Sequence, residues 1–203
     1  MSLKPREITR EKLLLVEGKD EVNFFEALLE QSGIEGFEII DVGGKRNFAK
    51  ELKMLALLTG FEKVKTLIIV RDADDNADDA FASAGSALHS IHFHTPNCQN
   101  ELREYEGRKV GIYIMPGNFE NGMLEDLCMS SVADQPVISC IESFFECIKQ
   151  KGCIPKNLSK AKAHVFLASQ SELVTSIGVA AKKGYWNFSH PSLQALTHFL
   201  QEA

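Results

Sequence analysis

The chain has 203 residues, of which 44% are hydrophobic and 25% charged, so it can bury a substantial core as one domain. It contains no apolar run of about 18 residues, and its start holds no long apolar stretch, so we expect neither a membrane-spanning helix nor a secretory signal. The net charge of −6 argues against a protein coated with basic surface for nonspecific DNA binding.

The five cysteines form no CxxC pair and leave an odd one over, which favours reduced thiols in a cytoplasmic protein.

Charge is distributed unevenly along the chain. Residues 71–150 carry 5 basic and 14 acidic side chains, whereas residues 151–203 carry 6 and 2. The basic C-terminal part can meet a phosphate-bearing partner, or its lysines are solvated surface charges.

Strand and helix patterns alternate along the first third of the chain. The apolar run Lys12–Val16 predicts a strand, and apolar residues at helical spacing over 22–29 predict a helix that Asp20 can cap. Phe37–Val42 predicts a second strand, and a second helix follows from Phe48 to Gly60. This alternation indicates βαβ units and a parallel sheet.

The third strand, predicted over Leu67–Val70, ends abruptly in carboxylates. On an extended backbone, side chains two residues apart point the same way, so Asp72 and Asp74 can converge on one ion. Carboxylate oxygens suit a hard cation such as Mg²⁺. Alternatively, this Asp-rich turn only caps the helix predicted over Ala77–Leu88.

The second half predicts one further strand and several helices. Ser90–Arg108 is polar and irregular, typical of a surface excursion, and Lys109–Met115 predicts the fourth strand. Further helices are predicted from Gly122 and over residues 135–150, 159–168 and 191–201. The predicted fold is therefore α/β and single-domain, with a parallel sheet of about four strands in a core of residues 12–130 and a helical C-terminal extension over 131–203.

Acidic residues follow two strands that are expected to be neighbours. Ligands bind outside the carboxyl ends of the strands in an open parallel sheet, so Glu17 should share one crevice with Asp72 and Asp74. Three carboxylates in one crevice disfavour full ionisation, and a divalent cation removes that cost. Mg²⁺, or Mn²⁺ in its place, can then orient and polarise a phosphate.

Four basic residues follow strand ends on the same predicted edge. They can contact the phosphates of a ligand, although a basic residue of this kind, taken alone, is more often a solvated surface charge: Lys19, Lys45, Arg46 and Arg71.

Two of these stretches, Leu14–Glu21 and Ile68–Asp74, resemble the two signature motifs of the Toprim domain. Type IA and type II topoisomerases, bacterial primases, recombination mediators, 5S RNA maturases and overcoming-lysogenisation-defect nucleases share that domain. Gly122–Leu127 resembles the acidic helix start of some nuclease-type members. The whole chain is similar to small stand-alone bacterial Toprim-like proteins of unassigned function, a DUF3226-like group.

The resemblance implies a Toprim-like, Rossmann-like fold with Glu17 as general acid/base or metal ligand. It implies metal-binding positions at Asp72 and Asp74, and a further acid at Glu125 or Asp126. No topoisomerase tyrosine context, zinc ribbon, ATPase module or primase domain is recognisable, which disfavours strand passage and primer synthesis.

The main hypothesis is therefore Mg²⁺-dependent, nuclease-like hydrolysis of DNA or RNA phosphodiesters. The alternative is a non-catalytic metal-binding module that contacts nucleic acid or a partner protein in a repair or defence system. A receiver-like or phosphatase-like protein with an Asp pair is disfavoured because the separate lysine and threonine residues that would accompany the pair are not evident. The sequence leaves the oligomeric state open.

Overall fold

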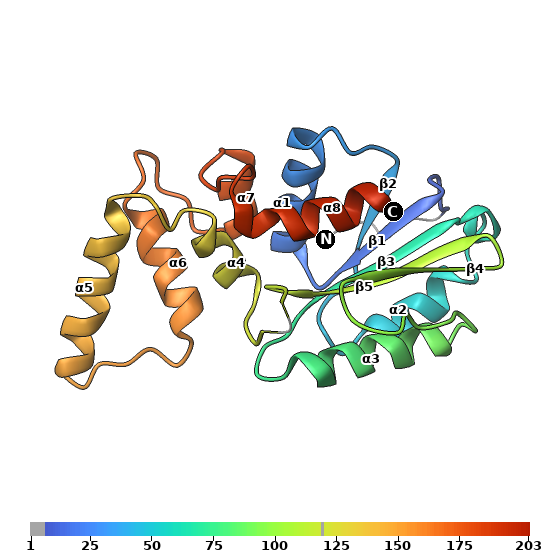
Figure 1. Cartoon of the computed structure of the whole chain (residues 1–203), viewed down its shortest axis with the longest axis horizontal. Coiled ribbons are helices and arrows are strands. Elements are labelled where there is room, and N and C mark those ends of the chain that lie inside the picture. The colour runs from blue at the N-terminus through green and yellow to red at the C-terminus, as the bar shows by residue number, and fades with distance from the viewer. Residues whose placement is uncertain (1–6, 119) are drawn as a thin grey trace.

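The computed structural model describes residues 7–118 and 120–203, which form a five-stranded sheet with helices on both faces (Figure 1). The order of the strands is β2-β1-β3-β5-β4, with β4 antiparallel to β5 and the other neighbours parallel. The strands are β1 (Lys12–Val16), β2 (Phe37–Asp41), β3 (Thr66–Asp72), β4 (Glu101–Tyr105) and β5 (Arg108–Met115). This arrangement confirms the predicted α/β class and its mainly parallel sheet.

Strand β4 lies inside the segment that was predicted to be irregular. Its side chains are exposed except for the half-buried Leu102, because β4 lies at the edge of the sheet. An exposed and charged edge strand lacks the apolar run that identifies a buried one. The prediction for this segment was therefore wrong.

The helices cover the two faces of the sheet, which the alternation of side chains defines. Leu14 and Val70 share a core with α1, α7 and α8, whereas Leu15 and Ile69 pack with α2 and α3 (Figure 1). The helices are α1 (Lys19–Gln31), α2 (Phe48–Leu55), α3 (Ala77–His89), α4 (Leu124–Ser130), α5 (Val137–Gln150), α6 (Leu158–Ala168), α7 (Ile177–Lys182) and α8 (Pro191–Glu202), with a 3-10 turn at Phe61–Lys63. None of these described helices is both long and apolar enough to cross a membrane.

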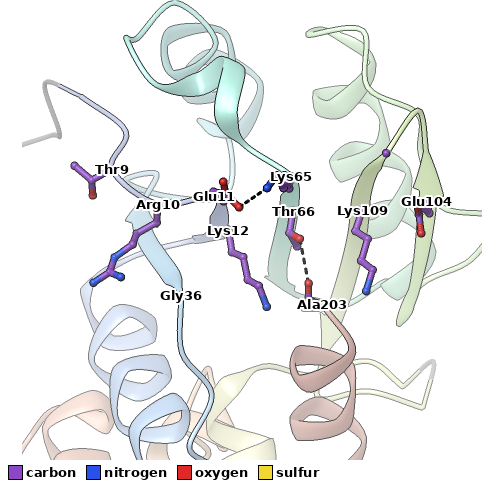
Figure 2. A pocket seen from close by; sticks show the side chains of 11 residues that line it. Thr9, Arg10, Glu11, Lys12, Gly36, Lys65, Thr66, Glu104, Lys109 and Ala203 are labelled. Carbon is purple, nitrogen blue, oxygen red and sulfur yellow. Dashed lines mark hydrogen bonds and ion pairs between the residues drawn. The ribbon is translucent and has the colours of Figure 1, made fainter.

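The end of the chain returns to the sheet. Helix α8 packs Phe199 against Tyr113 of β5, with 5.3 Å between the ring centroids. Gly111 makes room for this contact, since a Cβ there would lie 2.6 Å from Cζ of Phe199. At the edge where the parallel strands begin, the Thr66 hydroxyl donates a hydrogen bond of 3.0 Å to the Ala203 oxygen (Figure 2). Helices α5 and α6, in contrast, project away from the sheet (Figure 1).

Helix α7 packs directly on α1 and takes the carboxylate that was predicted to cap α1. The N-cap of α1 is Gly18, without a side-chain hydrogen bond. The Asp20 carboxylate instead accepts hydrogen bonds from the Ser176 hydroxyl and, at 3.4 Å, from the Gly178 N–H. A Cβ on Gly178 would lie 2.4 Å from the backbone oxygen of Asp20, so only glycine allows this approach. The capping prediction was wrong because a partner distant in sequence binds Asp20.

Candidate functional site

The two acidic junctions meet at the carboxyl edge of the sheet. Glu17 follows β1, and Asp72 is the last residue of β3, its parallel neighbour. The Glu17 carboxylate accepts a hydrogen bond of 3.4 Å from the Asp72 N–H. The topology therefore brings these two predicted site residues together.

Asp72 is partly buried and is held against the start of α4. Its Oδ1 accepts a hydrogen bond of 2.9 Å from the backbone N–H of Leu124. Burial raises the pKa of Asp72 well above its ordinary value, and the negative charges of Glu17, Glu21 and Glu125 raise it further. Asp72 is therefore a carboxyl group that ionises at a substantial cost in free energy.

Glu21 joins this site, although the sequence prediction gave it no role. It lies in the first turn of α1, four residues after Glu17. Burial raises the pKa of Glu21, and so do the charges of Glu17, Asp20 and Glu125. The signal in the sequence was the spacing of Glu17 and Glu21. Glu17 follows a strand, and Glu21 lies about one helical turn further on, at the start of the next helix.

Glu125 completes the group from α4. Its side chain is 13% exposed, and its Oε1 lies 3.8 Å from Nζ of Lys160 on α6. We call Glu17, Glu21, Asp72 and Glu125 the carboxylate cluster. The predicted alternative, Asp126, instead accepts the Met123 N–H at 2.9 Å and caps α4.

Arg71 lies on the opposite face of β3 from Asp72, as the alternation of side chains in a strand requires. The residue was predicted to contact phosphate, but its side chain is only 7% exposed, with Nε 3.5 Å from Oε1 of Glu17. Its Nη1 donates to the Ala80 oxygen at 3.3 Å, and its guanidinium lies 5.4 Å from the ring centre of Phe48. Arg71 is thus a buried counter-ion of Glu17.

Glu17 is subject to opposing influences. Burial raises its pKa, and the charge of Asp74 raises it further. The Arg71 charge and the hydrogen bond from the Asp72 N–H lower it. The net pKa of Glu17 is raised, so burial outweighs its counter-ion, which places this carboxyl group closer to neutrality than an exposed glutamate.

Asp74 does not continue β3. Strand β3 ends at Asp72, and Asp74 has a left-handed backbone with φ of 50°. Its backbone forms two hydrogen bonds with Gly122, of 2.7 and 2.9 Å. Its Oδ2 lies 2.6 Å from Nζ of Lys45. The extended geometry that was expected to align Asp72 and Asp74 is therefore absent.

The three other predicted basic residues are placed differently. Lys45 lies in the loop between β2 and α2 and reaches Asp74, and the hydrogen bond to Asp74 raises the pKa of Lys45. Lys19 opens α1 with an exposed side chain. Arg46 is also exposed, next to Lys45. Of the four basic residues, Lys45 and Arg71 thus have their cations beside the acids of the site.

The family model described as protein of unknown function DUF3226 matches residues 11–203. This chain belongs to the DUF3226 family. No curated protein matches the sequence significantly.

Three solved structures resemble this DUF3226 protein over nearly the whole chain. A hypothetical protein from Pyrococcus horikoshii OT3 has a TM-score of 0.63 at 20% identity, covering 96% of this chain and 95% of its own. The C-terminal region of the Burkholderia pseudomallei OLD protein has a TM-score of 0.52 at 14% identity, covering 96% and 98%. The corresponding region of the Xanthomonas campestris pv. campestris OLD protein has a TM-score of 0.51 at 15% identity, covering 95% and 93%. The shared fold therefore includes the helical C-terminal part.

The donor chemistry of the DUF3226 protein fits a hard divalent cation. Within residues 7–118 and 120–203, no three His, Cys, Asp or Glu side chains are already arranged to hold a metal ion. Mg²⁺, however, usually takes only one or two protein carboxylates and completes its shell with water and phosphate. Asp72 and Glu17 offer oxygen donors whose raised pKa values a cation would lower.

A cavity of about 550 Å³ lies at the other edge of the sheet (Figure 2). Three of its four basic residues already have partners: Lys12 lies over the ring of Phe37 at 5.4 Å, Lys109 donates to the Glu202 oxygen at 2.6 Å, and Lys65 pairs with Glu11 at 2.8 Å. The candidate site is therefore the carboxylate cluster and not this cavity.

Proposed function

We propose that this DUF3226 protein is a Mg²⁺-dependent phosphodiesterase that acts on nucleic acid as a nuclease. The carboxylate cluster carries the proposal, because four mutually repelling acids, two at the ends of parallel strands and two in the first turns of helices, are costly without a cation. The similarity of the motifs around Glu17 and Asp72 to those of Toprim nucleases supports the same reaction class. The structural likeness to OLD C-terminal regions supports the fold that such a site requires.

A bound Mg²⁺ would supply polarisation of the phosphate and of a water molecule. Asp72, fixed by the Leu124 N–H, would hold the cation together with Glu21 or Glu125. Glu17 would accept the proton of the attacking water, since a carboxyl group with a raised pKa is a better base near neutral pH. Attack forms a P–O bond, the bond to the leaving sugar oxygen breaks, and that oxygen takes up a proton from solvent water.

Two surrounding residues would support these steps. Arg71 would keep Glu17 ionised and oriented, because its guanidinium is the buried cation beside that carboxylate. Lys45 would move from Asp74 to a phosphate oxygen when substrate binds, since its side chain is 51% exposed. Asp74 would then become available as a further acid.

The second candidate is a metal-binding interaction module without turnover. The ion pair between Lys45 and Asp74 favours it, because an ammonium group already neutralises one predicted metal ligand. The net charge of −6 also weakens attraction for nucleic acid.

One pair of assays separates these functions. Mg²⁺ and Mn²⁺ are titrated calorimetrically into wild type, Asp72→Asn and the exposed control Asp78→Asn, and the same proteins are incubated with supercoiled plasmid and labelled single-stranded DNA and RNA. Metal-dependent cleavage that Asp72→Asn abolishes and Asp78→Asn retains supports the nuclease. Metal binding without cleavage supports the interaction module. No binding at millimolar metal contradicts both functions.

A further inference from the structure

Helix α5 carries an exposed apolar stripe. The helix is the outermost element at the end of the molecule that projects away from the sheet (Figure 1). Ile141 and Phe145 are its buried residues and form its contact with the core. Four other residues follow one another at spacings of three, four and three, and we call them the α5 stripe: Val137, Cys140, Phe144 and Cys147. Val137 is half-buried, Phe144 is 47% exposed, and both cysteines are exposed.

The charged residues of α5 lie on the other side of the helix. They are Glu142, Glu146 and Lys149, and all three line a pocket that α5 shares with the start of α6. At about 100° per residue, this side is opposite the α5 stripe. The stripe is thus an exposed helix face without charge over three turns, whereas the face of a helix that stays in water is usually charged and polar.

The aromatic ring in the stripe has a defined position. Phe144 packs edge-on against the buried Phe145, with 5.1 Å between the ring centroids and 83° between the planes. An exposed ring that its neighbour already orders loses little conformational entropy when a partner covers it. Aromatic residues are enriched, and charged residues depleted, at the centres of protein interfaces. The α5 stripe therefore has the composition of an interface centre.

The spacing of the stripe makes it complementary to itself. Apolar residues that alternate at spacings of three and four form the seam of a coiled coil. An antiparallel pair of α5 helices about a two-fold axis places Phe144 opposite Cys140 of the second copy, and Cys147 opposite Val137. Each large ring then meets a small side chain, so the two central layers can pack without collision.

The charges beyond the two ends of α5 favour this antiparallel orientation. Asp134 precedes the helix with a side chain that is 92% exposed, although its carboxylate lies 3.5 Å from Nε2 of His190. Lys151 directly follows the helix and is exposed. An antiparallel pair brings Lys151 beside Asp134 of the second copy, whereas a parallel pair brings like charges together. Opposed helix dipoles favour the same orientation.

We propose that two copies of this chain associate through the α5 stripe as an antiparallel helix pair. The inference goes beyond the proposed function and does not depend on it. A standard interface buries about 800 Å² on each partner, and one face of a 14-residue helix offers less. We therefore expect a weak dimer with a dissociation constant of about 1 to 100 µM.

The test is sedimentation equilibrium of the full chain in reducing buffer, over about 1 to 300 µM, because dimer formation depends on concentration. Wild type should shift from monomer to dimer, and Phe144→Glu should weaken dimerisation at least about 10-fold by placing a charge in the seam. The control Met54→Glu introduces the same charge on α2 at a matched exposure of 48% and should dimerise like wild type. Cys147→Glu repeats the test at an exposed position.

Disulfide mapping tests the orientation of the pair. In the antiparallel pair, a cysteine introduced by Val137→Cys lies opposite Cys147 of the second copy. Mild oxidation of this variant should therefore link these two positions, which peptide mapping identifies. A parallel pair would instead bring Cys140 beside Cys140 of the second copy and would link the wild-type protein at that position.

A wild-type protein that stays monomeric throughout would overturn the proposal and leave the stripe to a different partner protein. Dimers that persist in both Phe144→Glu and Cys147→Glu would overturn it as well, because association would then use another surface. Equal loss of dimer in Met54→Glu would show association without specificity for α5, which also contradicts the proposal. A wild-type disulfide between two Cys140 residues would overturn the antiparallel orientation.

Discussion

Replacement of Asp72 by asparagine should stabilise the metal-free protein at neutral pH. The amide oxygen of asparagine can still accept the Leu124 N–H, so the hydrogen bond of 2.9 Å is kept. The substitution removes a partly buried negative charge that burial and the charges of Glu17, Glu21 and Glu125 disfavour. Under the proposed function, the same charge would hold a cation.

The sign of the pH dependence follows from the raised pKa of Asp72. Between its ordinary value of 3.8 and the raised pKa, the native state binds more protons than the unfolded chain. Proton binding at Asp72 stabilises the native state fully below pH 3.8, and this stabilisation is lost as the pH rises through the raised pKa of Asp72. The raised pKa values of Glu17 and Glu21 act in the same direction. The free energy of unfolding of the wild type should therefore fall with rising pH more steeply than that of Asp72→Asn.

Each unit of pKa shift corresponds to about 1.4 kcal/mol. Because Asp72 retains some contact with solvent, we expect a gain of about 1 to 2 kcal/mol at pH 7.5, or about 2 to 8 °C in melting temperature for a chain of this size. The measurement is thermal unfolding in EDTA from pH 4 to 9. The exposed control Asp78→Asn should change stability by about 0.5 kcal/mol or less. Added Mg²⁺ should stabilise wild type and leave Asp72→Asn unchanged.

The reasoning is refuted if Asp72→Asn melts at or below the wild-type temperature in EDTA at pH 7.5. A wild-type stability that does not change with pH across this range would refute it as well. Stabilisation of the variant by Mg²⁺ equal to that of wild type would exclude Asp72 as a ligand.

Three further outcomes are expected. Glu21→Gln should weaken Mg²⁺ binding about 10-fold in calorimetry, whereas Glu30→Gln at an exposed position of α1 should not change it; equal affinities would remove Glu21 from the site. Lys45→Met frees Asp74 and should tighten Mn²⁺ binding, measured by electron paramagnetic resonance, about 2- to 5-fold, consistent with a partly exposed ion pair; weaker binding would contradict competition between lysine and metal. Gly178→Ala should destabilise the protein by about 1 to 3 kcal/mol in urea unfolding, because its Cβ would collide with α1, and an unchanged midpoint would contradict this close packing.

The sequence was informative wherever the signal is local. Hydrophobic runs and helical spacing predicted β1, β2, β3, β5 and most of the helices, because these patterns reflect burial of one face or both. The positions of Glu17 and Asp72 were also predictable. Parallel strands place their carboxyl ends at one edge, so two acids directly after two strands meet once the strands are neighbours.

The alternation of side chains within β3 contained information that the prediction did not use. Residues 67 and 69 lie on one face, so Arg71 continues that face into the core with α2 and α3, away from Asp72. The four-residue spacing of Glu17 and Glu21 likewise held the information that a helix start would bring both acids to one site.

Only the tertiary structure decided the remaining features. Asp74 leaves the strand geometry because its backbone pairs with Gly122, and Asp20 serves α7 because Ser176 and Gly178 reach it from far along the chain. Lys156 and Asn157, which precede α6, line one pocket with Lys45 and Asp74, and no local pattern in the sequence indicates that these segments meet. A sequence determines which residues are buried and which elements form, since those depend on local periodicity. The partner of each charge depends on which surfaces meet, and that is a property of the folded chain.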